Sequence, residues 1–208
     1  MKKRMFVMFL FALLLLTVPA SADTTALNAS AKPYVNLYKK RLRIGSYKKT
    51  PLKSFLILDI NQNGTPELIC KNVEPNATFC TYMVFTVMNG KLYHCGDYFT
   101  KTQRNVLYSK KDKGVYDSWW TNGVGGVGSV TYGISLKKKS LYKIRYAWSG
   151  AAAMGSSTMV YQIGPKATKV SKSKFTSYVN TFFPKNFSSR FKTYTFKSNT
   201  AANRNTIK

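Results

Sequence analysis

The sequence predicts an α+β fold: mainly an antiparallel β meander of about nine strands, flanked by an N-terminal and a C-terminal helix. Between residues 54 and 163, short apolar or alternating segments are separated by turn residues, with no helical pattern between them. On either side, at 34–42 and 175–183, apolar residues recur with the spacing of one helix face. Because short turns join strands of opposite direction, we expect antiparallel pairing.

The first 22 residues have the pattern of a secretory signal peptide. A basic start at Lys2, Lys3 and Arg4 precedes an apolar run and the small residues Ala20 to Ala22. The apolar run is shorter than the roughly 18 residues of a membrane-spanning helix. We therefore expect a secreted, extracellular protein. Its parts are a signal peptide at 1–22, a flexible leader at 23–32, a single mainly-β domain at 33–196 and a polar tail at 197–208.

The first predicted helix is amphipathic and basic. Pro33 suits a first helical turn, and Tyr34, Leu37, Tyr38 and Leu42 share one face. Lysines and arginines occupy much of the remaining surface. The helix could pack on the sheet with its lysines in solvent, or it could lie on a membrane surface.

The second predicted helix follows the last strand of the meander. Ser171 or Ser173 can cap its N-terminus, and Pro184 ends it. Its apolar stripe is expected to be core and consists of Phe175, Tyr178, Val179, Phe182 and Phe183. A final strand is expected at 191–196.

The strands of the meander are bounded by turn signals. The strongest is Asn89-Gly90, which favours a two-residue hairpin. Further turns are expected at 111–113, 137–139 and 164–165. The expected strands are 54–60, 67–73, 78–88, 91–99, 104–109, 114–120, 129–137, 140–148 and 157–163.

The segment between the first two strands has the side chains of a cation-binding loop. Asp59, Asn61 and Asn63 supply oxygen atoms at positions 1, 3 and 5, Gly64 permits a sharp turn, and the Thr65 carbonyl follows at position 7. Glu67 supplies the second carboxylate at position 9. These residues predict a weak Ca²⁺ site. The alternative is a metal-free turn, since Asn-Gly alone favours a hairpin.

This loop resembles the D-x-D-x-D-G-x-x-D/E loop of integrin-type FG-GAP and VCBS repeats. With its flanks it is also similar to the D-I-D-G-D-G-x-P-E-L-I stretch of small secreted proteins and lipoproteins of Gram-positive, Clostridia-like bacteria. Weaker resemblances to that group lie in the first helix, in the Tyr-rich hairpin at Asn89-Gly90, and in the C-terminal Asn199, Thr200, Asn203 and Arg204. The resemblance implies an extracellular, mostly β protein of undefined biochemical role. Asn61 and Asn63 stand where the pattern has acidic residues.

The charge of the chain is strongly positive. It has 33 Lys and Arg against 7 Asp and Glu, a formal net charge of +26. Such a field attracts polyanions, and for an exported protein these are anionic wall polymers, acidic glycans, lipid head groups or extracellular nucleic acid. The alternative is a solubilising coat without a specific partner, because the basic residues are spread along the chain.

Two groups of side chains are candidate ligand contacts. Lys143 and Arg145 alternate with apolar residues in 141–148, so we expect both on one basic, solvent-facing side of a strand. Trp119 and Trp120 lie beside a glycine-rich loop and could stack on sugar rings or bases, or fill the core. Their side chains must point to opposite faces of a strand.

Three cysteines leave one without a partner. If 67–73 pairs with 79–87 across the intervening turn, Cys70 and Cys80 face each other, so we expect a disulfide between them. The Asn89-Gly90 hairpin would place Cys95 about four residues out of register with Cys80, beyond disulfide reach. Cys95 is therefore expected to be free.

The sequence favours binding over catalysis. Its one histidine, His94, and the adjacent Cys95 fall on opposite faces of a strand and cannot form a dyad, and its acidic residues are scattered. One hypothesis is a secreted, calcium-stabilised module that binds an anionic extracellular or cell-wall polymer. The other is a structural or accessory envelope protein that its charge holds at the wall.

Overall fold

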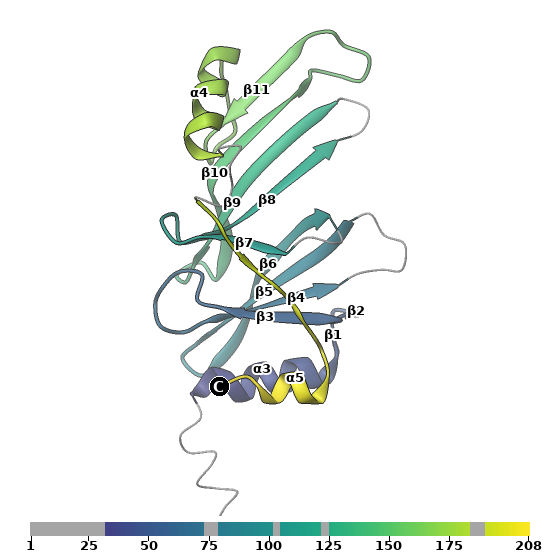
Figure 1. Ribbon diagram of the computed structural model, residues 1–208, viewed down its shortest axis with the longest axis vertical. Helices are drawn as coiled ribbons and strands as arrows, with labels where there is room; N and C mark the ends of the chain where they lie inside the picture. The colour runs from purple at the N-terminus through teal and green to yellow at the C-terminus, as the bar shows by residue number, and fades with distance from the viewer. Residues whose placement is uncertain (1–31, 73–78, 102–104, 122–124, 184–189) are drawn as a thin grey trace, which may run out of the picture. The chain divides into compact units, whose positions relative to one another are not determined.

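Two antiparallel sheets, of five and seven strands, form the framework of the protein (Figure 1). The structure is a computed structural model. It describes residues 32–208 apart from 73–78, 102–104, 122–124 and 184–189, and at 79, 99–101 and 119–121 it describes the backbone alone. The expected signal peptide and nearly all of the leader lie outside these ranges. The α+β prediction is confirmed, although the strands outnumber the nine expected.

The five-stranded sheet has the order β14-β3-β4-β5-β6. Its strands are β3 (Ser54–Leu58), β4 (Glu67–Asn72), β5 (Phe79–Met88), β6 (Lys91–Lys101) and β14 (Lys197–Ser198). The Asn89-Gly90 turn between β5 and β6 is confirmed: both residues have positive φ, 49° and 68°, as a type I′ hairpin requires. A small ribbon of β1 (Ser46–Tyr47) and β2 (Thr50–Pro51) precedes this sheet.

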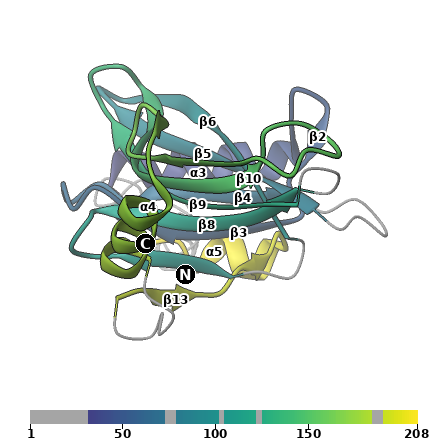
Figure 2. The same cartoon turned by 90° about the horizontal axis from the view of Figure 1, so that it is seen from above.

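The seven-stranded sheet has the order β12-β11-β10-β9-β8-β7-β13, and its central strands run side by side in Figure 2. Its strands are β7 (Val106–Ser109), β8 (Gly114–Thr121), β9 (Gly126–Ser135), β10 (Ser140–Ala151), β11 (Met159–Ile163), β12 (Thr168–Lys169) and β13 (Lys192–Tyr194). The expected meander is therefore divided between two sheets.

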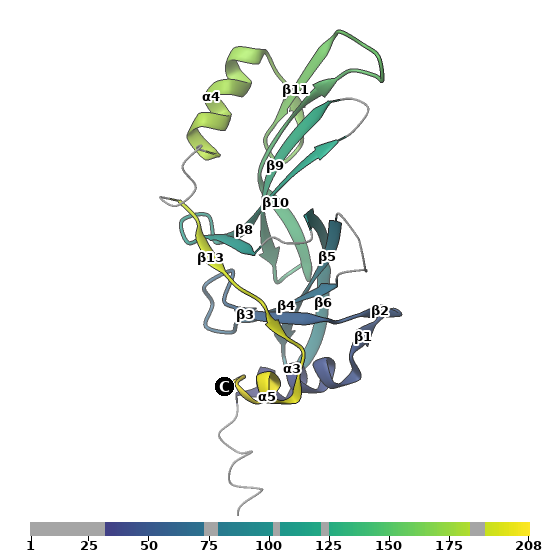
Figure 3. The same ribbon diagram turned by 45° about the vertical axis from the view of Figure 1, so that its right-hand side comes forward.

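Helix α3 (Pro33–Ile44) covers one face of the five-stranded sheet and lies beside α5 (Ala201–Asn205) (Figure 3). Tyr34, Tyr38 and Leu42 are buried there, with Phe85 of β5, as the helical spacing predicts. The apolar face of α3 is thus used by the core. None of the helices among the described residues is long and apolar enough to cross a membrane.

The other face of the five-stranded sheet packs against the seven-stranded sheet. One apolar cluster contains Ile69, Val84 and Tyr98 of the first sheet together with Val115 and Ile134 of the second. Strand β6 lies against β8 and β10 at this junction. The residues of this cluster alternate with those that face α3, as a pleated sheet requires.

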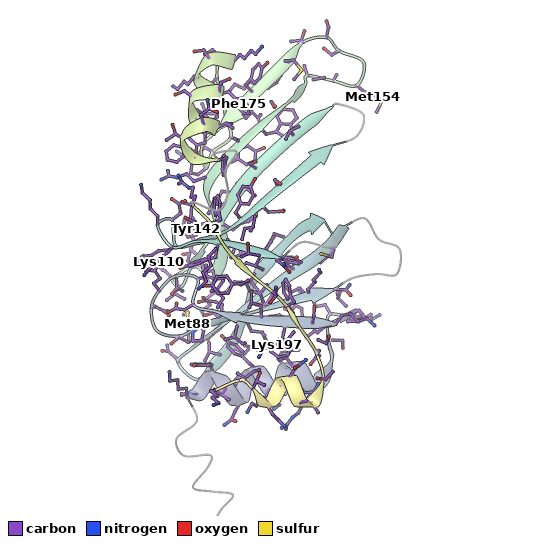
Figure 4. All side chains as sticks on the ribbon, in the orientation of Figure 1. Met88, Lys110, Tyr142, Met154, Phe175 and Lys197 are labelled. Carbon is purple, nitrogen blue, oxygen red and sulfur yellow. The ribbon has the colours of Figure 1, made fainter. Side chains whose placement is uncertain are left out.

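Helix α4 (Lys172–Phe182) covers part of the outer face of the seven-stranded sheet. Ser171 is its N-cap and accepts the N–H of Lys174, which confirms one of the two expected caps. The predicted stripe packs with Tyr116 and Ala147, and the ring of Phe175, labelled in Figure 4, lies 5.3 Å from that of Tyr161.

Residues 197–208, expected to be a polar tail, are folded. They form β14, which pairs with β3, and α5, and Ile207 is buried beside α3. Asn199 donates through Nδ2 to the carbonyl oxygens of Leu42 (3.0 Å) and Leu52 (2.9 Å). The segment lacks an apolar periodicity, so only the N-cap Thr200 and the single Ile207 signalled this in the sequence.

Candidate functional site

The loop between β3 and β4 is a tight turn held by its own polar side chains. The Asp59 carboxylate accepts the backbone N–H groups of Asn63 (3.1 Å) and Gly64 (2.9 Å). Asn61 Oδ1 also accepts the N–H of Asn63 (3.0 Å), and Asn63 Oδ1 accepts that of Thr65 (2.8 Å). Gly64 has φ of 84°, a conformation that favours glycine.

Glu67 lies at the base of this turn and is fully buried. Its carboxylate accepts the N–H of Ile60 (2.8 Å), the Asn61 side-chain amide (2.9 Å) and the Thr86 hydroxyl (3.4 Å). Burial raises the pKa of Glu67 to about 7, the Ile60 N–H acts in the opposite direction, and the nearby charge of Asp59 adds to the increase. Glu67 therefore anchors the loop to β5 from the inside.

The donor set of the loop partly fits a hard cation. Asp59, Asn61 and Asn63 present carboxylate and amide oxygens within one turn, and an oxygen that accepts one N–H keeps a second lone pair for an ion. Glu67 is less available, because three hydrogen bonds already use its oxygens. Among the described residues, no group of three or more His, Cys, Asp or Glu side chains is arranged to hold a metal.

The loop is attached to the seven-stranded sheet through Gln62, which has a left-handed backbone (φ 59°). Its Nε2 donates to the Tyr108 hydroxyl (3.0 Å) and to the carbonyl oxygen of Lys110 (2.7 Å). Tyr108 in turn donates to the carbonyl oxygen of Ile60 (3.2 Å). These hydrogen bonds join the predicted cation loop to β7 and to the turn that follows it.

Two lysine-rich turns lie at this end of the seven-stranded sheet. In a meander alternate turns share an end, so the β7–β8 and β9–β10 turns lie at the same end of the sheet, with the second turn carried two residues further along by the strand register. Figure 4 labels Lys110 in the first turn. We call the exposed lysines of these turns the basic rim: Lys110, Lys111, Lys113, Lys137, Lys138 and Lys139.

An acidic residue beneath the rim is already paired. The side chain of Asp112, only 4% exposed, lies 2.9 Å from Arg190 and 3.8 Å from Arg145, and it accepts the Ser109 hydroxyl at 3.0 Å. Asp97 is likewise engaged with His94 at 2.6 Å. Because two arginines pair with Asp112, its carboxylate does little to neutralise the rim lysines.

The expectation that Lys143 and Arg145 share one solvent-facing side is wrong. The β9–β10 register shifts between these residues, so a bulge at Ile144 turns them to opposite faces. Lys143 Nζ lies 4.3 Å from the ring centroid of Tyr146, whereas Arg145 stacks on Phe182 of α4 at 4.1 Å and faces Asp112. Arg145 therefore links β10 to α4 and to the turn that contains Asp112.

Trp119 and Trp120 lie in β8, opposite Gly128 and Val127 of β9. The side chains themselves are outside the described part of the structure, so their stacking role stays a prediction.

The expected disulfide between Cys70 and Cys80 is wrong in this structure. Cys70 of β4 lies opposite Met83 of β5, three residues along the strand from Cys80. Cys70 is buried in the core that faces α3, whereas Cys80 is buried in the core between the two sheets. This register places Leu68 opposite Phe85, so apolar side chains meet on one face. All three cysteines are buried, and none of them forms a disulfide.

Cys95 and His94 do not form a catalytic pair. The β5–β6 register shifts at Val84/Phe85, and His94 packs against Phe85 on the α3 side while Cys95 enters the core between the sheets. Burial raises the pKa of Cys95 to about 12, so its thiol is not an activated nucleophile.

No protein-family model, no curated protein and no solved structure matches this chain.

Proposed function

We propose that the protein is a secreted, non-catalytic module that binds anionic extracellular polymers, such as wall polymers, acidic glycans or nucleic acid. The observation that carries this proposal is the basic rim, in which six exposed lysines from two turns stand at one end of a sheet. Each turn spans only a few residues, so the lysines of one turn lie within a Debye length, about 8 Å at physiological salt, and their fields add.

The cation loop would support this rim. If Ca²⁺ binds, Asp59, Asn61 and Asn63 and the Thr65 carbonyl would hold it, with Glu67 as the fixed base of the loop. The ion would supply positive charge and rigidity at the point where Gln62 contacts the β7–β8 turn. Because Glu67 is buried and Asp59 is the other carboxylate of the loop, the affinity should be low, in the range of extracellular modules, about 10⁻⁴ to 10⁻³ M.

Chromatography of the mature chain on different polyanions tests the proposal. We expect retention on phosphocellulose, carboxymethyl cellulose, heparin and DNA to differ at equal charge density, with a steep dependence on salt for the preferred polymer. The other candidate function, an envelope accessory protein held by charge alone, predicts equal and weak retention on all four. Retention that does not depend on salt would contradict both.

A further inference from the structure

A pocket of about 660 Å³ lies beside the cation loop, and three cations line it. They are Lys110 after β7, Arg190 and Lys192 of β13. Strand β13 pairs with β7, with Lys192 opposite Tyr108, so the chain brings together residues about 80 positions apart. The lysines at 110 and 192 are exposed, which leaves their ammonium groups accessible.

The guanidinium of Arg190 already makes hydrogen bonds within the protein. Its two terminal nitrogens donate to Asp112 (2.9 Å) and to the carbonyl oxygen of Thr181 (3.0 Å). A bidentate pair with a carboxylate on a ligand would have to displace Asp112. Arg190 therefore contributes positive charge to the pocket, while the mobile donors are the two lysines.

The uncharged polar groups of the pocket are also engaged. The Tyr108 hydroxyl donates to Ile60 and accepts from Gln62, and Gln62 donates to Lys110 as well. Asp59 faces the pocket with both oxygens hydrogen-bonded to backbone N–H groups of its own loop. This carboxylate opposes an anionic ligand, so the two lysines must outweigh it.

The remaining walls are apolar or aromatic and come from Leu58, Phe191 and Tyr194. Lys192 Nζ lies 5.2 Å from the ring centroid of Tyr194, which holds the ammonium group at the edge of this wall. The volume exceeds that of a single inorganic anion and accommodates a small organic group bound to one. Lysine ammonium groups bind phosphate as point charges without requiring a planar, bidentate partner.

We infer that this pocket binds a phosphate ester unit of a sugar or small polyol, with Lys110 and Lys192 donating to the phosphate oxygens and Tyr194 contacting the carbon skeleton. The inference deepens the proposed function and rests on it, because it identifies the charged unit of the bound polymer as a phosphate ester.

Glycerol 3-phosphate is the probe that tests the pocket. Calorimetric titration at low salt compares the parent protein with Lys110→Gln/Lys192→Gln and with a matched control, Lys166→Gln/Lys169→Gln, which removes two exposed lysines near β12. We expect the pocket variant to bind about tenfold more weakly, since each exposed charge pair contributes up to about 1 kcal/mol. The control should stay within about twofold of the parent, and glycerol should not bind. Equal weakening in both double variants, or no binding by the parent, would overturn the inference.

Retention of the same proteins on phosphocellulose and carboxymethyl cellulose separates this inference from the proposed function. Stronger retention on phosphocellulose that the pocket variant loses supports both. A parent protein that is retained on polyanions but does not bind glycerol 3-phosphate leaves the proposed function standing and overturns the pocket. A parent that binds glycerol 3-phosphate but passes through every column overturns the assignment of the pocket to a polymer unit and the proposed function with it.

Discussion

Replacing Glu67 by Gln should remove a large pH dependence of stability. Glu67 is fully buried, and its pKa rises from 4.5 to about 7 on folding. Below pH 4.5 the folded and unfolded chains both hold the proton. As the pH rises from 4.5 to 7, the unfolded chain releases it first, so the folded state loses stability over this window and the loss is complete above it. At about 1.4 kcal/mol for each pKa unit, the loss is about 3 kcal/mol.

Urea unfolding, followed by tryptophan fluorescence at several pH values with a calcium chelator, measures this loss. Glutamine keeps an oxygen that can accept the Ile60 N–H but has no proton to release. The free energy of unfolding of the parent, relative to that of Glu67→Gln, should fall by about 3 kcal/mol between pH 4.5 and 8. Lys91→Gln, an exposed residue of the β5–β6 hairpin that has no carboxyl group, is the control. Parallel pH curves for the parent and Glu67→Gln would refute the argument.

Three further predictions concern the loop, the thiols and the ion pair. Calcium at ten times its dissociation constant should stabilise the protein by about 1.4 kcal/mol, which is a few degrees in melting temperature. Asp59→Ala should abolish this response, and Asn61→Asp should enlarge it. If calcium leaves the melting temperature of all three proteins unchanged, the loop is a metal-free turn. Alkylation of the unfolded chain without reductant should modify Cys70, Cys80 and Cys95 alike, whereas a protected pair would reveal a disulfide. Asp112→Asn should cost about 2 kcal/mol in urea unfolding, because Arg145 and Arg190 would lose a buried counter-charge; a cost below about 0.5 kcal/mol would show that the pair is screened by solvent.

Local patterns in the sequence were sufficient for the two longer helices, α3 and α4, and for the central hairpin. The spacing of Tyr34, Tyr38 and Leu42 specifies one buried helix face, and Asn89-Gly90 specifies a type I′ turn. In both cases the determining residues are neighbours along the chain, so no long-range contact decides the outcome.

Features that depend on register could not be predicted in the same way. Bulges at Cys95 in β6 and at Ile144 in β10 shift the alternation of side chains. Gly96, with a φ of 139°, lies beside the first bulge, whereas neither neighbour of Ile144 is a glycine or proline. The bulge in β10 explains why Lys143 and Arg145 separate. The loop at 59–67 was recognisable from its residue types, but its contact with Lys110 requires the packing of two sheets and could not be read from spacing.

The most direct test of the proposed function removes the charge of one rim turn. Lys137→Gln/Lys138→Gln/Lys139→Gln is compared with Lys166→Gln/Lys169→Gln/Lys172→Gln, which loses the same charge from exposed positions outside the rim. The measurement is the salt dependence of binding to the polyanion that retains the parent best. If the rim lysines contact the polyanion, the slope of log affinity against log salt concentration should be smaller by about two to three in the rim variant than in the parent. The slope of the control variant should stay close to that of the parent. Equal slopes for the two variants would contradict the proposal, because binding would then follow net charge alone.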